Sequence, residues 1–273
     1  MTPTGAVALT TDEIRCYIRK KLWRIIARMA CIPADRAYNT LDGISSPPDL
    51  PEGPGGVIFF MMMMTAPPNP QAIAFVDGQN LFYAGKQAFG YRWPNYDPVL
   101  LAQSVCRAKG WALVQVRFYT GVPDKSDNPL WHQFWAAKLL DMSRRKVHVF
   151  SRALRYNNRT IKLPDGTQCS FLVGQEKGID VRLALDVVSL ALARSYDVAV
   201  IFSQDQDLTE AVDEVKAIAG MQTRWIKVAC AFPASPTSTN KRGINKTDWI
   251  KIARTEYDSC LDPKDYRPSK PNP

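Results

Sequence analysis

The sequence predicts an α/β protein with a mostly parallel sheet that helices cover on both faces, in a three-layer α/β/α arrangement. Three observations support this fold class. Short apolar runs of strand length alternate with longer segments of helical periodicity from residue 71 onward. Acidic residues follow two of the apolar runs within three positions, at the strand ends where α/β sheets bind ligands. The 273-residue chain is 46% hydrophobic, which is enough to form a sizeable core.

The predicted elements follow one another in a regular order. Strand patterns occur at residues 72–76, 112–119, 147–150, 198–202 and 222–228, and helical patterns occur at 98–109, 129–142, 177–194 and 207–218. The stretch 152–173 breaks this alternation. Its turn signals, Tyr156-Asn-Asn-Arg159 and Leu163-Pro-Asp-Gly166, lie among β-favouring residues, so an extended excursion or a hairpin is expected there.

The two ends of the chain differ from its centre. Residues 11–30 read as a basic amphipathic helix, and the stretch up to residue 70 is rich in Pro and Gly, which is typical of a linker. We therefore expect an N-terminal helix and linker over 1–70, either dispensable for folding or used as an interaction helix. A folded domain is expected over 71–255, and a disordered Pro-rich tail over 256–273.

The cysteines and apolar runs exclude some classes of protein. Six cysteines are widely scattered without a C-x-x-C pair, and the chain has only two histidines, so neither a zinc site nor a disulfide framework is indicated. This pattern predicts a reducing, cytoplasmic setting. The longest apolar run, residues 57–64, is less than half the length that spans a bilayer, so no membrane span is expected.

Positive charge is concentrated in the central part of the chain. The formal net charge is +9, and residues 71–255 hold 25 basic and 16 acidic side chains. A domain that is this basic suits a polyanionic partner. The alternative is that the basic residues only favour solubility.

Three separate segments place carboxylates where they could converge. Asp77 follows the first predicted strand, Asp205 and Asp207 follow the fourth, and Asp180 lies at the start of a helical pattern. Carboxylates that are gathered without balancing lysines repel one another. Hard divalent cations such as Mg²⁺ or Mn²⁺ relieve this repulsion, because they prefer oxygen ligands.

The same segments resemble a known family. They read Phe75-Val-Asp-Gly-Gln-Asn-Leu81, Lys177-Gly-Ile-Asp-Val-Arg-Leu-Ala-Leu-Asp186 and Ser203-Gln-Asp-Gln-Asp-Leu208. In this order they resemble the signature segments of the NYN domain, in its LabA-like branch, within the PIN-like superfamily of metal-dependent nucleases. The resemblance covers about residues 71 to 230 and implies a PIN-like three-layer fold.

By this resemblance, four aspartates match the catalytic, metal-holding positions of PIN-like nucleases: Asp77, Asp180, Asp205 and Asp207. The implied cofactor is Mg²⁺ or Mn²⁺, which orients a water for in-line attack on a phosphodiester and stabilises the departing oxygen. The implied activity is that of a metal-dependent, endoribonuclease-type hydrolase.

Each of these acids also has a purely structural interpretation. Asp77 can open a turn, Asp207 fits a helix N-cap, and Asp180 suits the positive end of a helix. Asp186 lies about 240° around the helix from Asp180, so the two cannot share one face. Four residues are therefore expected around the metal or in structural roles: Asn80, as a helix cap or phosphate contact, Glu176, Asp186 and Ser203.

Basic and aromatic residues of the stretch 138–162 are the best local signal for substrate binding. The expected substrate-binding residues are Arg144, Arg145, Arg152, Arg155, Tyr156 and Arg159, together with Lys177 beside the acids. Tyr156 and Phe150 could stack unpaired bases, which favours single-stranded RNA as the partner. The alternative is an exposed helix end and hairpin with ordinary surface charge. A homo-oligomer is a further possible assembly.

Two other functions remain open from the sequence. Asp205-Gln-Asp-Leu-Thr209 fits the D-x-D-x-T pattern of haloacid-dehalogenase-like phosphatases, but it lies far into the domain and lacks a downstream acidic pair. The stronger rival is an RNA-binding or regulatory NYN module with little or no catalysis. The presence of four aspartates favours catalysis, since a pure binder has no need to tolerate their repulsion.

Overall fold

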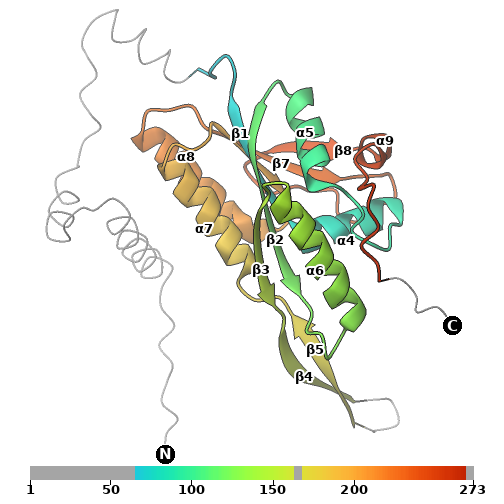
Figure 1. Cartoon of the computed structure of the whole chain (residues 1–273). Coiled ribbons are helices and arrows are strands. Elements are labelled where there is room, and N and C mark those ends of the chain that lie inside the picture. The colour runs from blue at the N-terminus through green and yellow to red at the C-terminus, as the bar shows by residue number, and fades with distance from the viewer. Residues whose placement is uncertain (1–64, 163–167, 269–273) are drawn as a thin grey trace, which may run out of the picture. The chain divides into compact units, whose positions relative to one another are not determined.

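In residues 65–162 and 168–268, the part of the chain that the computed structural model describes, six parallel strands form a central sheet with helices on both faces (Figure 1). The predicted three-layer class is thus confirmed. The predicted N-terminal helix and nearly all of the linker lie outside the described residues, as does the turn signal at 163–166. No helix of the described part is long and apolar enough to cross a membrane.

The elements agree with the predicted ranges over most of the domain. The sheet strands are β1 (Gln71–Asp77), β2 (Ala112–Val122), β3 (His148–Ala153), β6 (Val198–Phe202), β7 (Lys227–Pro233) and β8 (Asp248–Ile252). The helices are α4 (Gly78–Phe89), α5 (Pro98–Ala108), α6 (Pro129–Arg144), α7 (Ile179–Leu192), α8 (Thr209–Met221) and the short α9 (Arg254–Asp258), with a 3₁₀ turn, η1 (Gln206–Leu208), before α8.

The strand order is β3-β2-β1-β6-β7-β8, so the chain returns to the middle of the sheet after β3. β1 lies between β2 and β6 and runs parallel to both, with Val76 paired to Phe202. The chain leaves β1 and β6 toward opposite sides of the sheet, which makes this a topological switch point of the kind where α/β proteins bind ligands. Asp77 ends β1 and Ser203 follows β6, so both lie at this point.

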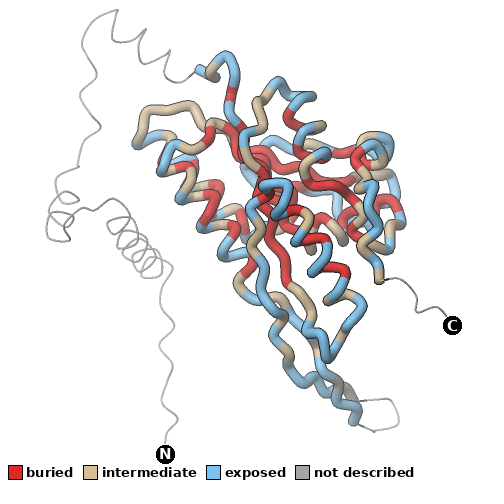
Figure 2. The backbone as a smooth tube through the Cα atoms, in the orientation of Figure 1, coloured by how far each residue is buried: buried red, intermediate tan, exposed pale blue. Residues whose placement is uncertain are grey.

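Alternate residues of the buried strands face opposite helix layers. In β1, Ala74 and Val76 join the apolar cluster that includes α4, α5 and α6, while Ile73 and Phe75 join the cluster that includes α7 and α8. Figure 2 shows the buried strands lying between two helical layers whose outer faces are exposed. Each large apolar side chain buried in this way stabilises the fold by about 1.5–3 kcal/mol.

A two-stranded antiparallel ribbon projects from the body of the domain (Figure 1). It consists of β4 (Arg155–Lys162) and β5 (Gln168–Gln175), paired from Arg155 with Gln175 to Lys162 with Gln168. We call this ribbon the arm. The expected hairpin in the stretch 152–173 is confirmed, although the turn signal Tyr156-Asn-Asn-Arg159 lies within β4. From Arg155 to Thr160 every side chain except Tyr156 is exposed.

One prediction for the C-terminal third of the sheet is wrong, and one strand there was missed. The last predicted strand does not begin at residue 222, because α8 continues to Met221 and Thr223 takes a left-handed conformation with φ of 47°. β7 begins instead at Lys227. The edge strand β8 was not predicted, since only Ile252 among its residues is fully buried and it lacks the continuous apolar run of the inner strands.

The segment 256–268, predicted as part of a disordered tail, packs on the domain instead. α9 buries Tyr257, and beyond it Asp262 accepts a hydrogen bond from Lys138 Nζ at 3.0 Å. The aromatic ring of Tyr266 lies against Phe134 and under the Lys138 ammonium, with Nζ 5.0 Å from the ring centroid. The prolines of this segment indicated irregular backbone, and irregular backbone can still be fixed by side-chain contacts.

Candidate active site

Asp77 is a buried carboxylate at the topological switch point, with 9% of its surface exposed. Its Oδ1 accepts a hydrogen bond from the backbone N of Asn80 at 3.0 Å, so Asp77, and not Asn80, caps α4. Its Oδ2 accepts a hydrogen bond from Ser203 Oγ at 3.1 Å. The carboxylate therefore bridges the ends of β1 and β6.

Glu176 and Asp180 approach from the end of the arm and the start of α7. Glu176 Oε1 accepts a hydrogen bond from the backbone N of Gly121, at the end of β2. A Cβ at Gly121 would lie 2.5 Å from Glu176 Cγ, so only glycine permits this approach. Gly178, with φ of 74°, turns the chain into α7, where Asp180 occupies the first turn.

Electrostatic interactions connect four carboxylates. The pKa of Asp77 is raised from 3.8 to about 6, mainly by burial; hydrogen bonds from Asn80 and Ser203 lower it, and the charges of Asp205 and Asp180 add to the rise. Burial likewise raises the pKa of Glu176 from 4.5 to about 7, with contributions from Asp77 and Asp180. We call Asp77, Glu176, Asp180 and Asp205 the carboxylate cluster.

Asp205 and Asp207 have different surroundings. Asp205 is partly buried, and its Oδ1 accepts a hydrogen bond from the backbone N of Asp207 at 3.0 Å, so Asp205 caps η1. The N-cap role predicted for Asp207 is therefore wrong. The side chain of Asp207 is exposed, and its charge is not among those that raise the pKa of Asp77.

The cluster fits a divalent cation in its chemistry. All its donors are carboxylate oxygens, the donor type that Mg²⁺ and Mn²⁺ prefer. Within residues 65–162 and 168–268, none of the four carboxylates forms an ion pair, so their mutual repulsion has no balancing cation from the protein. In the same residues, no three acidic, histidine or cysteine side chains are arranged closely enough to hold a metal ion as they stand.

Asp186 has a role on a different face of α7. It is buried and accepts hydrogen bonds from Arg117 Nη2 and Tyr119 Oη, each at 2.8 Å. Arg182, one turn earlier, pairs with its other oxygen at 2.8 Å. Asp186 therefore ties α7 to β2.

The predicted substrate-binding residues differ in whether their side chains are exposed and unpaired. Arg145 is not free to bind substrate, because its two terminal nitrogens each lie 2.7 Å from an oxygen of Asp97. Lys138, in the same basic stretch, is buried. Five predicted residues are exposed and form no ion pair within the described part of the chain: Arg144, Arg152, Arg155, Arg159 and Lys177. Tyr156 is partly buried, and its hydroxyl accepts a hydrogen bond from the backbone N of Asp124.

Sequence reasoning missed Gln204 and Gln206, which flank Asp205. The backbone N of Gln204 donates to Asn80 Oδ1 at 2.9 Å, and its side chain is 8% exposed. Its Nε2 donates to the backbone carbonyl of Arg242 at 2.8 Å. Glutamines beside an acidic motif read as ordinary surface residues, and only the folded loop after β7 reveals their partners.

Asp77→Asn is expected to raise the free energy of unfolding by about 2–3 kcal/mol near pH 8 in EDTA. Between about pH 4 and 6, the folded protein keeps a proton on Asp77 that the unfolded chain has released, so stability falls as pH rises through this window. Asn is neutral: its Oδ1 can accept the hydrogen bond from the backbone N of Asn80, and its Nδ2 can donate to Ser203 Oγ. Urea unfolding of both proteins should show a gain near pH 8 that disappears near pH 4. A loss of stability at both pH values would contradict this account.

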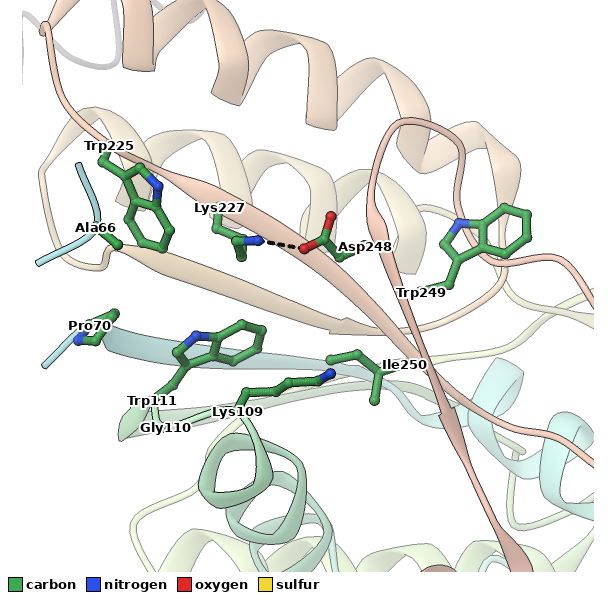
Figure 3. A pocket seen from close by; sticks show the side chains of 10 residues that line it. All are labelled: Ala66, Pro70, Lys109, Gly110, Trp111, Trp225, Lys227, Asp248, Trp249 and Ile250. Carbon is green, nitrogen blue, oxygen red and sulfur yellow. Dashed lines mark hydrogen bonds and ion pairs between the residues drawn. The ribbon is translucent and has the colours of Figure 1, made fainter. Parts of the chain in front are cut away.

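A hollow of about 640 Å³ lies at the other edge of the sheet, where the strands begin. Figure 3 shows the indoles of Trp111 and Trp225 facing this hollow, Lys227 paired with Asp248, and the ring of Trp249 turned away. No member of the carboxylate cluster lines it. The candidate active site is therefore the region around Asp77 at the carboxyl ends of the strands.

Comparison with protein-family models agrees with the acidic motifs. Residues 72–242 match the NYN domain family. Among solved structures, a protein of unknown function from Vibrio parahaemolyticus is similar over 71% of this chain and 99% of its own, with 17% identity and a TM-score of 0.40. Ribokinase from Giardia lamblia is similar over 63% of this chain and 53% of its own, with 10% identity and a TM-score of 0.28. No curated protein matches the chain significantly. Since the family match spans more than half of the sequence, the chain belongs to the NYN domain family.

Proposed function

We propose that this protein is a metal-dependent ribonuclease of the LabA-like branch, which hydrolyses phosphodiester bonds of single-stranded RNA. The observation that supports this most directly is the carboxylate cluster at the switch point of an NYN domain, which no cation among the described residues balances. A protein that only bound RNA would place cations, and not four acids, beside the phosphates.

In this proposal, Asp77, Asp180 and Asp205 hold Mg²⁺ or Mn²⁺, and exposed Asp207 contributes less. When bound, the metal supplies an activated water and neutralises charge on the departing oxygen. Ser203 keeps Asp77 oriented through its hydrogen bond to Oδ2. Glu176, with a pKa of about 7, can hold or release a proton near neutral pH.

The test of the proposed function is incubation of the purified protein with labelled single-stranded RNA in Mn²⁺, Mg²⁺ or EDTA. Cleavage is expected with either metal and not with EDTA. Binding without cleavage in any metal would favour the second candidate, an RNA-binding NYN module. The specific observation in favour of that alternative is that no three of the described side chains form a closed metal site as they stand.

The arm is expected to bind RNA through its phosphates. Arg155 and Arg159 are four positions apart in β4, so they lie on the same face of the ribbon. Both side chains are exposed. Arg155→Ala/Arg159→Ala should weaken RNA binding in EDTA and lower the salt dependence of log K by about 1.4, since each of the two single-strand phosphate contacts contributes about 0.7.

The matched control for the arm is Lys109→Ala, which removes a positive charge at the hollow on the opposite edge of the sheet. It should leave both affinity and salt dependence near wild type. If the arm variant and the control behave alike in fluorescence anisotropy, the arm has no specific part in binding.

A further inference from the structure

The loop between β7 and β8, residues 234–247, is held by the two residues that flank Asp205. Gln204 Nε2 donates to the backbone carbonyl of Arg242 at 2.8 Å and to that of Asn240 at 3.4 Å. Gln206 Nε2 donates to the backbone carbonyl of Gly243 at 2.9 Å. Both side chains thus fix the backbone of this loop beside the carboxylate cluster.

This attachment continues into the rest of the site. Gln206 Oε1 also accepts a hydrogen bond from the backbone N of Asn245 at 3.3 Å, and the backbone N of Gln204 donates to Asn80 Oδ1 at 2.9 Å. Ile244, in the middle of the loop, is fully buried. The start of α4, the end of β6 and the loop are therefore one hydrogen-bonded unit, and the loop has a defined position relative to Asp205.

The loop is basic and contains no acidic residue. Lys246 is neutralised by Asp213 of α8, 2.6 Å away. Lys241 and Arg242 are exposed, and neither forms an ion pair with a carboxylate in the part of the chain that the structure describes. Among the described residues, the guanidinium of Arg242 donates only to Asn245 Oδ1, with Nη2 3.4 Å from that oxygen. Two unpaired cations therefore stand on a fixed loop at the edge of an acidic site.

The loop and the arm lie on opposite sides of the cluster. The arm leads into Glu176, which contacts the end of β2, whereas the loop follows β7, and the strand order between them is β2-β1-β6-β7. A polyanion that crosses the carboxyl ends of these strands would meet cations before and after the carboxylates. Charge complementarity thus favours a nucleic-acid strand over an acidic patch on a folded protein, because only an extended strand carries phosphates on both sides of one point.

We propose that Lys241 and Arg242 bind RNA phosphates on the side of the cleavage site opposite to the arm. This inference rests on the proposed function and assigns the loop as its second substrate-binding element. Gln204 and Gln206 are positioning residues for this loop. Because both flank Asp205, they fix the position of the phosphate-binding side chains relative to Asp205.

The first test measures RNA binding in EDTA by fluorescence anisotropy, so that catalysis has no influence. Lys241→Ala/Arg242→Ala is expected to weaken binding roughly tenfold at about 0.1 M salt and to lower the salt dependence of log K by about 1.4. The matched control is Lys246→Ala, in the same loop, whose ammonium is already paired with Asp213. It should change affinity less than about twofold. Equal effects of the double variant and the control would overturn the proposal.

The second test separates the two sides of the cluster. For oligoribonucleotides with uncharged methylphosphonate linkages on one side of the cleavage site, affinity should not change with Lys241→Ala/Arg242→Ala. When the uncharged linkages lie on the other side, affinity should not change with the arm variant, Arg155→Ala/Arg159→Ala. If both variants respond to the same side, the loop does not lie opposite the arm and the proposal fails. If wild type binds RNA in EDTA but cleaves none with metal, the proposed function fails while the anisotropy test still decides the role of the loop.

Discussion

Asp205→Asn is expected to abolish cleavage of single-stranded RNA, with a fall in rate of roughly a thousandfold or more, while RNA affinity stays equal or rises. Asp205 lies close enough to Asp77 to raise its pKa, and it stands at the end of β6 beside Ser203. A metal ligand stabilises the transition state by several kcal/mol, and each 1.36 kcal/mol corresponds to about tenfold in rate. Binding should not suffer, because one negative charge near the phosphates is removed.

Asp207→Asn is the matched comparison for this experiment. It removes the same charge two residues later from an exposed side chain that does not raise the pKa of Asp77. Single-turnover cleavage in Mn²⁺ should therefore fall much less for Asp207→Asn than for Asp205→Asn, provided that both proteins unfold at the wild-type temperature. If Asp205→Asn cleaves at the wild-type rate, the nuclease is a contaminant or uses another site, and the binding-module hypothesis takes its place.

The inner part of the fold was predictable because its signals are local. Strands such as Val198–Phe202, buried on both faces, read as continuous apolar runs, and the turn-rich stretch at 152–173 marked the arm. Edge strand β8 escaped prediction because an edge strand is only half covered. The C-terminal segment escaped because its order comes from contacts across 124 residues of sequence, such as that between Lys138 and Asp262.

The acidic residues of the candidate site could be identified from the sequence, but the residues that surround them could not. Asp77 and Asp205 follow predicted strands, and Asp180 lies at the start of a predicted helix. The rule that parallel strands end at one edge of a sheet led to the expectation that these acids converge. The sequence does not show which basic residues remain without an ion-pair partner. Arg144 and Arg145 are neighbours of the same charge, and only Arg145 pairs with Asp97. Partners such as Gln204 and the loop after β7 depend on the folded structure.

Asp262→Ala is expected to lower the free energy of unfolding by about 3–5 kcal/mol, although composition alone predicts a disordered tail over residues 256–273. The Lys138 ammonium is fully buried and donates to Asp262 Oδ2 at 3.0 Å and to the backbone carbonyl of Tyr96 at 2.8 Å. Burial lowers the pKa of Lys138, and the charge of Asp262 opposes this effect. Removing Asp262 therefore leaves a buried cation without its carboxylate. Urea unfolding near neutral pH measures the loss.

Two further variants distinguish the buried pair from a general effect of the segment. Asp265→Ala breaks only exposed contacts with Arg267 and should leave urea unfolding near that of wild type. Lys138→Met/Asp262→Leu removes both charges together and should recover most of the stability that Asp262→Ala loses, because two apolar side chains of similar size leave no charge to desolvate. If the double variant is no more stable than Asp262→Ala, the loss comes from packing of the segment. If Asp262→Ala unfolds like wild type, residues 262–268 do not anchor the domain, and α6 tolerates a buried lysine through the Tyr96 carbonyl and the ring of Tyr266 alone.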